Sequence, residues 1–220
     1  MATNFISYLT AGAAAMLLSA CNGILSNIYD EPSTDAVSEY GFVSEATTTS
    51  PGSIYIDATD YTVWTYIDFR SMTTTALDVN APVPASWDIA IHRYDAKTNG
   101  AEVMETGATS FYSLANVVTP TENDYVSDIW TTTTIVTDMS TMMDGYLSYA
   151  ESFYNPELSK WLNVDKSSMP PIYTPSNKVY VIRLSDGTLA GVRLANYMDG
   201  LGVKGYMTIE YMYPLNLESA

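Results

Sequence analysis

The stretch 179–197 constrains the fold more than any other part of the sequence. It reads VYVIRLSDGTLAGVRLANY, two runs rich in β-branched and aromatic residues around an Asp186-Gly187 pair. Such a pair favours the type I′ turn, which joins two antiparallel strands. A further run, VKGYMTIEYMYP, alternates apolar and polar residues up to Pro214, as a half-buried strand does. These segments predict an antiparallel sheet in the carboxyl-terminal part of the chain.

Strand character continues through the rest of the chain. The composition includes 18 Tyr, and aromatic and β-branched side chains suit pleated, half-buried surfaces. The Thr98-Asn99-Gly100 stretch is expected to be the turn that closes the strand before it. The predicted strands are 53–58, 62–69, 87–94, 102–104 and 129–137, and a first strand is allowed near 40–43.

One short helix is expected over 156–164. Asn155 can cap it, Pro156 suits the first helical position, and the apolar residues that follow share one face at i, i+3 and i+4 spacing. At 220 residues the chain is long enough for one sizeable core. The prediction is a single, mainly β domain with one or two short helices.

The amino terminus carries a processing signal. Residues 11–18 form an apolar run too short to span a bilayer as a helix, and the run leads into Leu18-Ser19-Ala20-Cys21. This resembles a bacterial lipobox, although no Lys or Arg precedes the apolar run. We expect a lipoprotein signal peptide at 1–20, lipidation at Cys21 and a tether over 21–52 that leads to a domain at 53–220. Cys21 is the only cysteine, so no disulfide can form within the chain.

Charge and residue types exclude several function classes. The 9 basic and 25 acidic residues give a formal net charge of -16, which repels the phosphate backbone of nucleic acids. His92, the only histidine, lies in a predicted strand with no nucleophile motif beside it, which favours a structural role over catalysis. Gly200, Gly202 and Gly205 match G-x-G-x-x-G but precede a strand, so they indicate a turn rather than a dinucleotide site. No enzyme activity is expected.

A cluster of methionines stands out in DMSTMMDG, residues 138–145. In a helix, Met139, Met142 and Met143 would share one face and form a small core patch. The Thr-rich approach and Gly145 favour instead a strand that runs into a loop. A fourth thioether, Met169, precedes two prolines that fix an extended backbone. The residues alone favour packing, with an apolar cleft edged by tyrosines, Tyr146 and Tyr173 among them, as the alternative.

Several stretches resemble the HmuY family of haem-binding lipoproteins of Bacteroidota. The likeness covers essentially the whole chain from about residue 53. The stretches that carry it are the lipobox at Cys21, WTYIDF (64–69), PASWDIAIHRYDAKTNGA (84–101), MSTMMDG (139–145), LSKWL (158–162), MPPIY (169–173), NKVYVIRLSDGTLAGVRLANYM (177–198) and KGYMTIEYMYP (204–214).

The resemblance implies a hand-like all-β domain that holds haem, iron protoporphyrin IX, between two loop fingers. Family members ligate the iron through two histidines or two methionines, and His92 lies in neither finger here. The two-methionine pattern implies Met142 and Met169 as axial ligands, with Met139 and Met143 as alternatives to Met142. Tyr146 and Tyr173 are then expected beside the haem.

The same resemblance implies a role in haem and iron acquisition. A lipoprotein on the cell surface, held at the outer membrane by its lipid alone, would take haem, with host haemoproteins as a source. It would deliver the haem to an outer-membrane receptor, and release in soluble form is an alternative to permanent anchoring. The competing function is a non-haem surface lipoprotein that binds a protein or glycan through the same loops.

Overall fold

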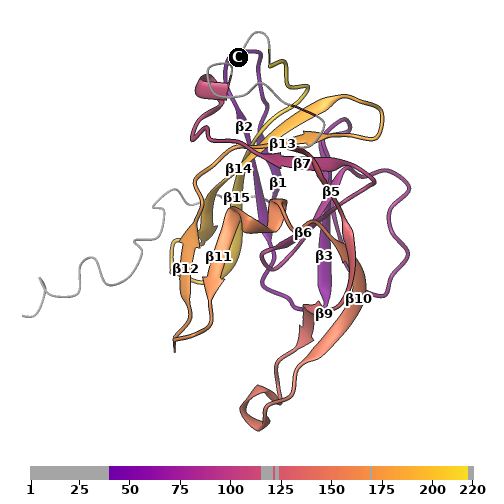
Figure 1. The fold of residues 1–220 in the computed structure, drawn as a ribbon, viewed down its shortest axis with the longest axis vertical. Helices are drawn as coiled ribbons and strands as arrows, with labels where there is room; N and C mark the ends of the chain where they lie inside the picture. The colour runs from indigo at the N-terminus through magenta and orange to yellow at the C-terminus, as the bar shows by residue number, and fades with distance from the viewer. Residues whose placement is uncertain (1–39, 115–120, 122–123, 169, 218–220) are drawn as a thin grey trace, which may run out of the picture.

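The computed structural model describes residues 40–114, 121, 124–168 and 170–217. Every strand pairing in this part of the chain is antiparallel. Two sheets form the body and two hairpins project from it (Figure 1). The larger sheet has seven strands, in spatial order β1 (Gly41–Ser44), β2 (Gly52–Asp57), β15 (Lys204–Met212), β14 (Leu189–Met198), β13 (Tyr180–Arg183), β7 (Glu102–Glu105) and β8 (Val126–Ser127).

The smaller sheet has four strands, in spatial order β4 (Thr73–Asp78), β3 (Val63–Asp68), β5 (Ile89–His92) and β6 (Asp95–Thr98). Finger 1 is the hairpin of β9 (Ile129–Asp138) and β10 (Ser148–Tyr154), and finger 2 is the hairpin of β11 (Leu162–Asp165) and β12 (Ile172–Pro175). Three short 3-10 helices are described: η1 (Phe111–Ser113), η3 (Met142–Asp144) and η4 (Leu158–Trp161). The mainly β prediction is confirmed.

The core lies between the two sheets. Ile54, Val192 and Ile209 of the larger sheet belong to the same buried cluster as Ile67 and Ile89 of the smaller sheet, and each of these side chains is fully buried. Burial of such a side chain stabilises the fold by about 2 kcal/mol. Because this one cluster includes residues of both sheets, the body is expected to fold as one cooperative unit.

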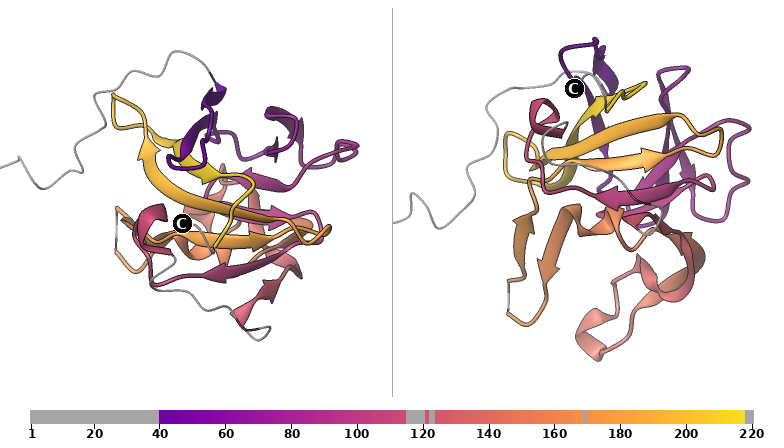
Figure 2. Two further views of the ribbon diagram at one scale, coloured as in Figure 1. Left: turned by 90° about the horizontal axis from the view of Figure 1, so that it is seen from above. Right: turned by 45° about the horizontal axis from the view of Figure 1, so that its top comes forward.

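Both fingers leave the same end of the body. They point the same way in Figure 1 and in the right-hand view of Figure 2, so the two views agree on their arrangement. No helix of the described residues is long and apolar enough to cross a membrane. The predicted signal peptide, Cys21 and Met169 lie outside the described residues. β1 lies within the stretch expected to be a tether, where the sequence also allowed a strand.

Several strand predictions are confirmed, and one turn is misplaced. Gly187, with φ 84°, turns β13 into β14, and β15 ends before Pro214 as expected. The prediction that Asn99-Gly100 closes the strand 87–94 is wrong. That strand ends at His92, and the chain reverses at Arg93 and Tyr94 so that β5 pairs with β6. The Asn99-Gly100 turn instead passes the chain from the smaller sheet to the larger one.

The predicted helix over 156–164 is only partly formed. The single turn η4 covers four residues, and the rest of the predicted segment is strand β11. The side chain of Asn155 still caps the turn, because its Oδ1 accepts hydrogen bonds from the backbone N–H of Glu157 and Leu158 at 3.1 and 2.8 Å. The buried faces of Leu158 and Trp161 then hold η4 against the core.

Candidate functional site

Finger 1 is anchored part-way along β9 and free at its tip. Ile135 of β9 is fully buried in a cluster with Trp64, Tyr66 and Ala90 of the smaller sheet. Beyond Ile135 the side chains of β9 and of the loop are exposed or half-buried. This contact therefore fixes the direction of the finger, and only the end of the finger lies in solvent.

Local hydrogen bonds shape the tip of finger 1. The carboxylate of Asp138 accepts the backbone N–H of Ser140 at 2.7 Å, which starts the turn. The 3-10 turn η3 follows and ends at Gly145, whose φ of 86° suits glycine. The backbone N–H of Tyr146 then donates to the carbonyl of Thr141 at 3.2 Å and closes the loop. The loop keeps its shape without a core of its own.

The methionines of this loop differ in exposure. Met142 is 38% exposed, Met143 is 89% exposed, and Met139 is half-buried. None of the three belongs to a buried cluster of the described residues, so the reading of them as a core patch is wrong. Tyr146 lies in the same loop and is 71% exposed. Exposed thioethers without a packing role call for another explanation, such as contact with a ligand.

Finger 2 is held at its root by Trp161. The indole Nε1 of this buried residue donates to the carbonyl of Tyr94 at 2.8 Å, and its own carbonyl accepts the N–H of Ser176 at 2.9 Å. Both ends of the hairpin are thus tied to the body. The described residues of the tip are 166–168, 170 and 171.

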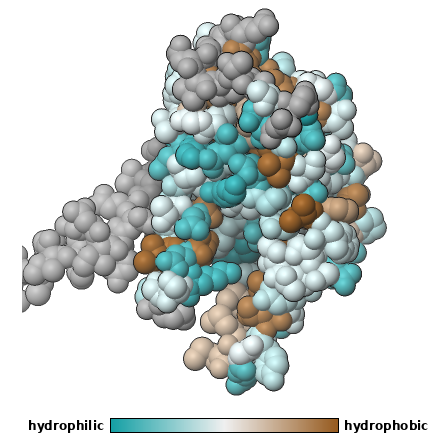
Figure 3. All heavy atoms as spheres, viewed as in Figure 1, coloured by the Kyte–Doolittle hydropathy of each residue, from teal (hydrophilic) through white to brown (hydrophobic). Residues whose placement is uncertain are grey.

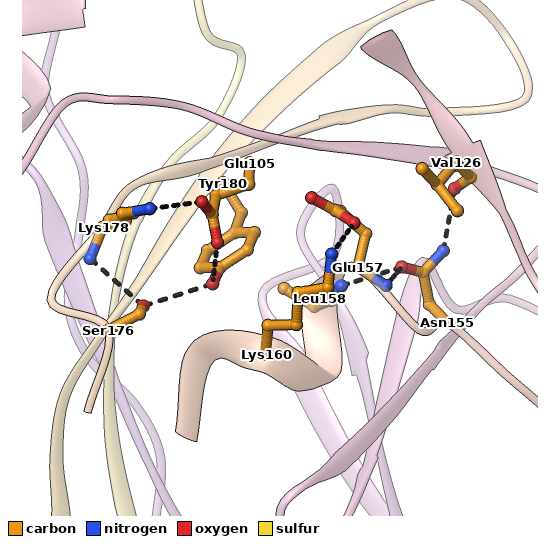
Figure 4. A network of polar contacts seen from close by, with 9 residues as sticks. All are labelled: Glu105, Val126, Asn155, Glu157, Leu158, Lys160, Ser176, Lys178 and Tyr180. Carbon is orange, nitrogen blue, oxygen red and sulfur yellow. Dashed lines mark hydrogen bonds and ion pairs between the residues drawn. The ribbon is translucent and has the colours of Figure 1, made fainter. Parts of the chain in front are cut away.

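One hydrogen-bonded frame joins the roots of the two fingers (Figure 4). Asn155, which is fully buried, follows directly after β10 and caps η4, which leads into β11. Its Nδ2 donates to the carbonyl of Val126 at 3.0 Å and to Oδ1 of Asp128 at 2.9 Å, beside the start of β9. A single side chain therefore links the entry and the exit of finger 1 to the start of finger 2.

A second set of polar contacts lies at the end of finger 2. The hydroxyl of Tyr180 donates to Glu105 at 3.1 Å and lies 3.2 Å from Oγ of Ser176, the residue after β12. Lys178 pairs with the other oxygen of Glu105. Figure 4 shows this set and the contacts of Asn155 as two separate groups near η4. Polar contacts therefore hold the chain at the end of finger 2 as well as at its start.

A tyrosine cluster lies on the inner side of finger 2. Tyr173 of β12 stacks on Tyr197 with ring centroids 5.7 Å apart and meets Tyr94 edge to face at 5.4 Å. The Nζ of Lys204 lies 5.0 Å from the ring centre of Tyr173. Tyr173 therefore packs against the body, whereas Tyr146 lies at the tip of the other finger. The sequence predicted Tyr173 but missed Tyr94, Tyr197 and Lys204, which lie far away in the chain.

Comparison with known proteins assigns the family. A family profile described as HmuY protein matches residues 60–211 of this chain. This chain belongs to the HmuY family. None of the curated proteins matches the sequence.

Solved structures support the HmuY-family fold. A proposed HmuY-like haem-binding protein from Bacteroides vulgatus is 56% identical, covers 81% of this chain and 100% of its own, and superimposes with a TM-score of 0.75. A proposed lipoprotein from Bacteroides fragilis is 49% identical, covers 80% and 96%, and also gives 0.75. The apo HmuY analogue of Tannerella forsythia, at 24% identity, 73% and 94% coverage and a TM-score of 0.64, supports the fold alone.

His92 is part of the HmuY-family scaffold and not of the fingers. The side chain is 1% exposed, and its Nε2 donates to the carbonyl of Tyr61 at 2.8 Å. Burial lowers the pKa of His92, so the ring is neutral near pH 7. The expected structural role is confirmed, and this imidazole is not available to a ligand at the finger tips.

The carboxyl group of Asp95, near finger 2, has a shifted pKa. This residue follows the β5–β6 turn, beside the tyrosine cluster. Burial raises the pKa of Asp95 to about 6, and the positive charge of Lys166 on finger 2 opposes that shift. Asp95 could not be selected from the sequence, because its burial results from the fold.

Proposed function

We propose that this HmuY-family protein binds haem between its two fingers and ligates the iron through methionine sulfur. Met142 is the proposed ligand from finger 1, with Met139 and Met143 as its alternatives, and Met169 is the proposed ligand from finger 2. Tyr146 and Tyr173 flank the bound group. The observation that carries the proposal is the exposure of the finger 1 thioethers on a loop with no core to fill.

The donor set fits haem chemistry. A thioether is a neutral, soft ligand that haem iron accepts in proteins, and it raises the reduction potential of the iron. Bound haem would supply the iron coordination positions and two flat apolar faces. This chain supplies sulfur at the finger tips, while its only imidazole is buried in the scaffold. The relative from Bacteroides vulgatus, described as haem-binding, supports the same ligand.

Surface shape also supports a site between the fingers. Figure 3 shows the finger ends as separate lobes at the lower end of the molecule, with apolar residues on the lobe of finger 1. The net charge of -16 gives no long-range attraction for the anionic propionates of haem. Affinity must therefore come from burial of the porphyrin faces, at about 25 cal/mol per Å², and from the iron bonds.

The proposed biological role is haem and iron acquisition at the cell surface. Lipidation at Cys21 would hold the protein at the outer membrane, and the proposed lipoprotein from Bacteroides fragilis supports the lipidation. The protein would capture haem, with host haemoproteins as a source, and pass it to an outer-membrane haem receptor. It acts as a carrier and not as an enzyme in this proposal.

Visible spectra of the purified protein with added haem test the ligands. Replacement by Leu keeps the size of the side chain and removes the sulfur. Met169→Leu and one of the three finger 1 variants should therefore abolish the change that the protein causes in the spectrum of reduced haem. The finger 1 variants are Met142→Leu, Met139→Leu and Met143→Leu, and Met72→Leu is the matched control because it lies in the β3–β4 turn. Spectra that none of the finger variants changes would favour the non-haem interaction function.

Reduction and acidification give two further readouts. Thioether ligands favour ferrous iron, so dithionite should tighten haem binding. Methionine has no proton to gain near neutrality, so binding should persist on acidification from pH 7 to pH 5.5, where imidazole ligands would be protonated. A tight ferric complex that dissociates below pH 6.5 would contradict methionine ligation.

A further inference from the structure

A second cavity lies on the body, between the smaller sheet and the root of finger 1. Its volume is about 570 Å³, within the range of small-molecule sites. The walls come from β3, β6, the β4–β5 connection and the β9–β10 hairpin, which lie together in Figure 1. Met139, Met142 and Met143 do not line it. The cavity is therefore separate from the finger tips.

A buried lysine forms part of the cavity wall. Lys97 of β6 is 8% exposed, and its Nζ lies over the rings of Trp64, Tyr66 and Trp87 at 4.1, 5.0 and 5.8 Å from their centres. Aromatic faces attract a cation but accept no strong hydrogen bond from it. Nζ donates one conventional hydrogen bond among the described residues, to the hydroxyl of Tyr66 at 3.1 Å.

This ammonium lacks a direct counter-ion in the described part of the chain. No carboxylate oxygen there forms an ion pair with Lys97. The nearest acidic influence is Asp128, whose two oxygens already accept hydrogen bonds from Thr98 and Asn155. Burial lowers the pKa of Lys97 to about 8, so the side chain still carries its charge at pH 7. A buried cation with unused N–H donors is costly, and an anion would satisfy it.

The outer part of the cavity is apolar. Trp130 and Phe153 pack edge to face at 5.0 Å and are 54% and 53% exposed, and Val83 is 55% exposed. Large apolar side chains gathered at the mouth of a cavity are typical of a ligand site. They would lose contact with water when an apolar group entered. The lining thus combines one deep cation with an apolar mouth.

We propose that this cavity binds a small amphipathic monocarboxylate, with the carboxylate on Lys97 and an apolar ring or chain between Trp130, Phe153 and Val83. Asp128 and Glu151 also line the cavity, and the whole chain carries a charge of -16. A second carboxylate on the ligand would meet these groups, so a single negative charge is favoured. The site is independent of the proposed haem function.

Two matched probes test this site in the purified full chain without haem. 2-Naphthoate carries the carboxylate, and 2-naphthamide has nearly the same shape without the charge. Isothermal titration calorimetry should show that naphthoate binds at least tenfold more tightly than naphthamide. Lys97→Met should remove this preference. Arg70→Gln, which makes the same change in net charge at an exposed ion pair, should retain it.

A second variant separates binding from folding. Trp130 is more than half exposed, so Trp130→Ser should leave the fold intact while it weakens both probes by a similar factor, because only apolar contact is lost. Equal affinities of the two probes in the unmodified protein, or a preference that survives Lys97→Met, would overturn the proposal. So would displacement of naphthoate by haem, or no naphthoate binding at millimolar concentration. Loss of haem binding in the finger variants would leave this result unchanged.

Discussion

Asn155 is the residue whose replacement should reveal most about how the fingers are held. Its side chain makes four hydrogen bonds, to the carbonyl of Val126, to Asp128, and from the N–H groups of Glu157 and Leu158. The variant Asn155→Ala removes all four; of their partners, Leu158 is buried and the other three are half-buried.

The expected loss in the free energy of unfolding is about 3 kcal/mol. A net hydrogen bond contributes about 1 kcal/mol, and buried partners left unsatisfied cost more. Water that enters the space left by the truncated side chain satisfies some of these partners. The four bonds therefore set an upper limit near 4 kcal/mol, and the expected loss is smaller. For a domain of this size the corresponding fall in Tm is about 6–12 °C.

Urea unfolding followed by circular dichroism measures this loss directly. Asn163→Ala is the matched control, because Asn163 is an exposed residue of β11, and its replacement should change the stability by less than about 0.5 kcal/mol. A loss below about 1 kcal/mol for Asn155→Ala would refute the view that this side chain holds the finger roots together.

The variant Asn155→Asp refines the same test. It places a carboxylate where Nδ2 now lies 2.9 Å from Oδ1 of Asp128. Two adjacent carboxylates raise the pKa of one of them in the folded state above its unfolded value. Stability from such a group is lost as the pH rises through the folded pKa. The deficit of Asn155→Asp should therefore be larger at pH 8 than at pH 5, and a deficit independent of pH would contradict this contact.

Three further outcomes follow from single residues. Burial raises the pKa of Asp95 to about 6, so ionisation weakens the fold as the pH rises through 6, and Asp95→Asn should be more stable than the unmodified protein at pH 8 but not at pH 4 in urea unfolding. Burial lowers the pKa of His92, so stability falls as the pH drops below about 6.5, and His92→Gln should flatten that fall between pH 7 and pH 5. A Cβ at Gly52 would lie 2.5 Å from the carbonyl oxygen of Ser44, so Gly52→Ala should lower Tm by several degrees in a thermal melt. An unchanged Tm would show that the backbone at Ser44 shifts without loss of stability.

Strands of the body such as β2 and β15 could be predicted from the sequence because each has one buried face. In β15 the buried and half-buried residues alternate along the strand, and the sequence shows the same period. The outer parts of the fingers have no such face. β12 alternates only between exposed and half-buried residues, so its pattern carries little signal. The sequence consequently missed β10, β11 and β12 as paired strands.

The misplaced turn shows a second limit. Asn99-Gly100 does reverse the chain, and Gly100 has φ 70°, but the strand before it had already ended. The actual turn has Arg93 at φ 52°, a conformation that non-glycine residues seldom adopt. Its guanidinium donates to the carbonyls of Ala58 and Thr59, which lie far away in the chain. Contacts of this kind fix a turn that local sequence cannot predict.

The candidate sites were likewise only partly predictable from the sequence. The resemblance to the HmuY family pointed to the methionines and to Tyr146 and Tyr173, whereas the residues alone favoured packing, with a tyrosine-edged apolar cleft as the alternative. Lys97 gave no such signal, since a lysine in a strand is normally solvent-exposed. Only the packing of Trp64, Tyr66 and Trp87 around it turns an ordinary residue into a buried cation.

Stability and ligand binding are separable in this architecture. The described residues of the finger tips bury little area, whereas the roots carry the buried groups Asn155 and Trp161. A change at the tip, such as Met142→Leu, should therefore leave the free energy of unfolding within about 0.5 kcal/mol of the unmodified protein. Changes at the root should lower both stability and binding, because the spacing of the tips depends on the root. A protein with this division can exchange side chains at the finger tips without rebuilding its core.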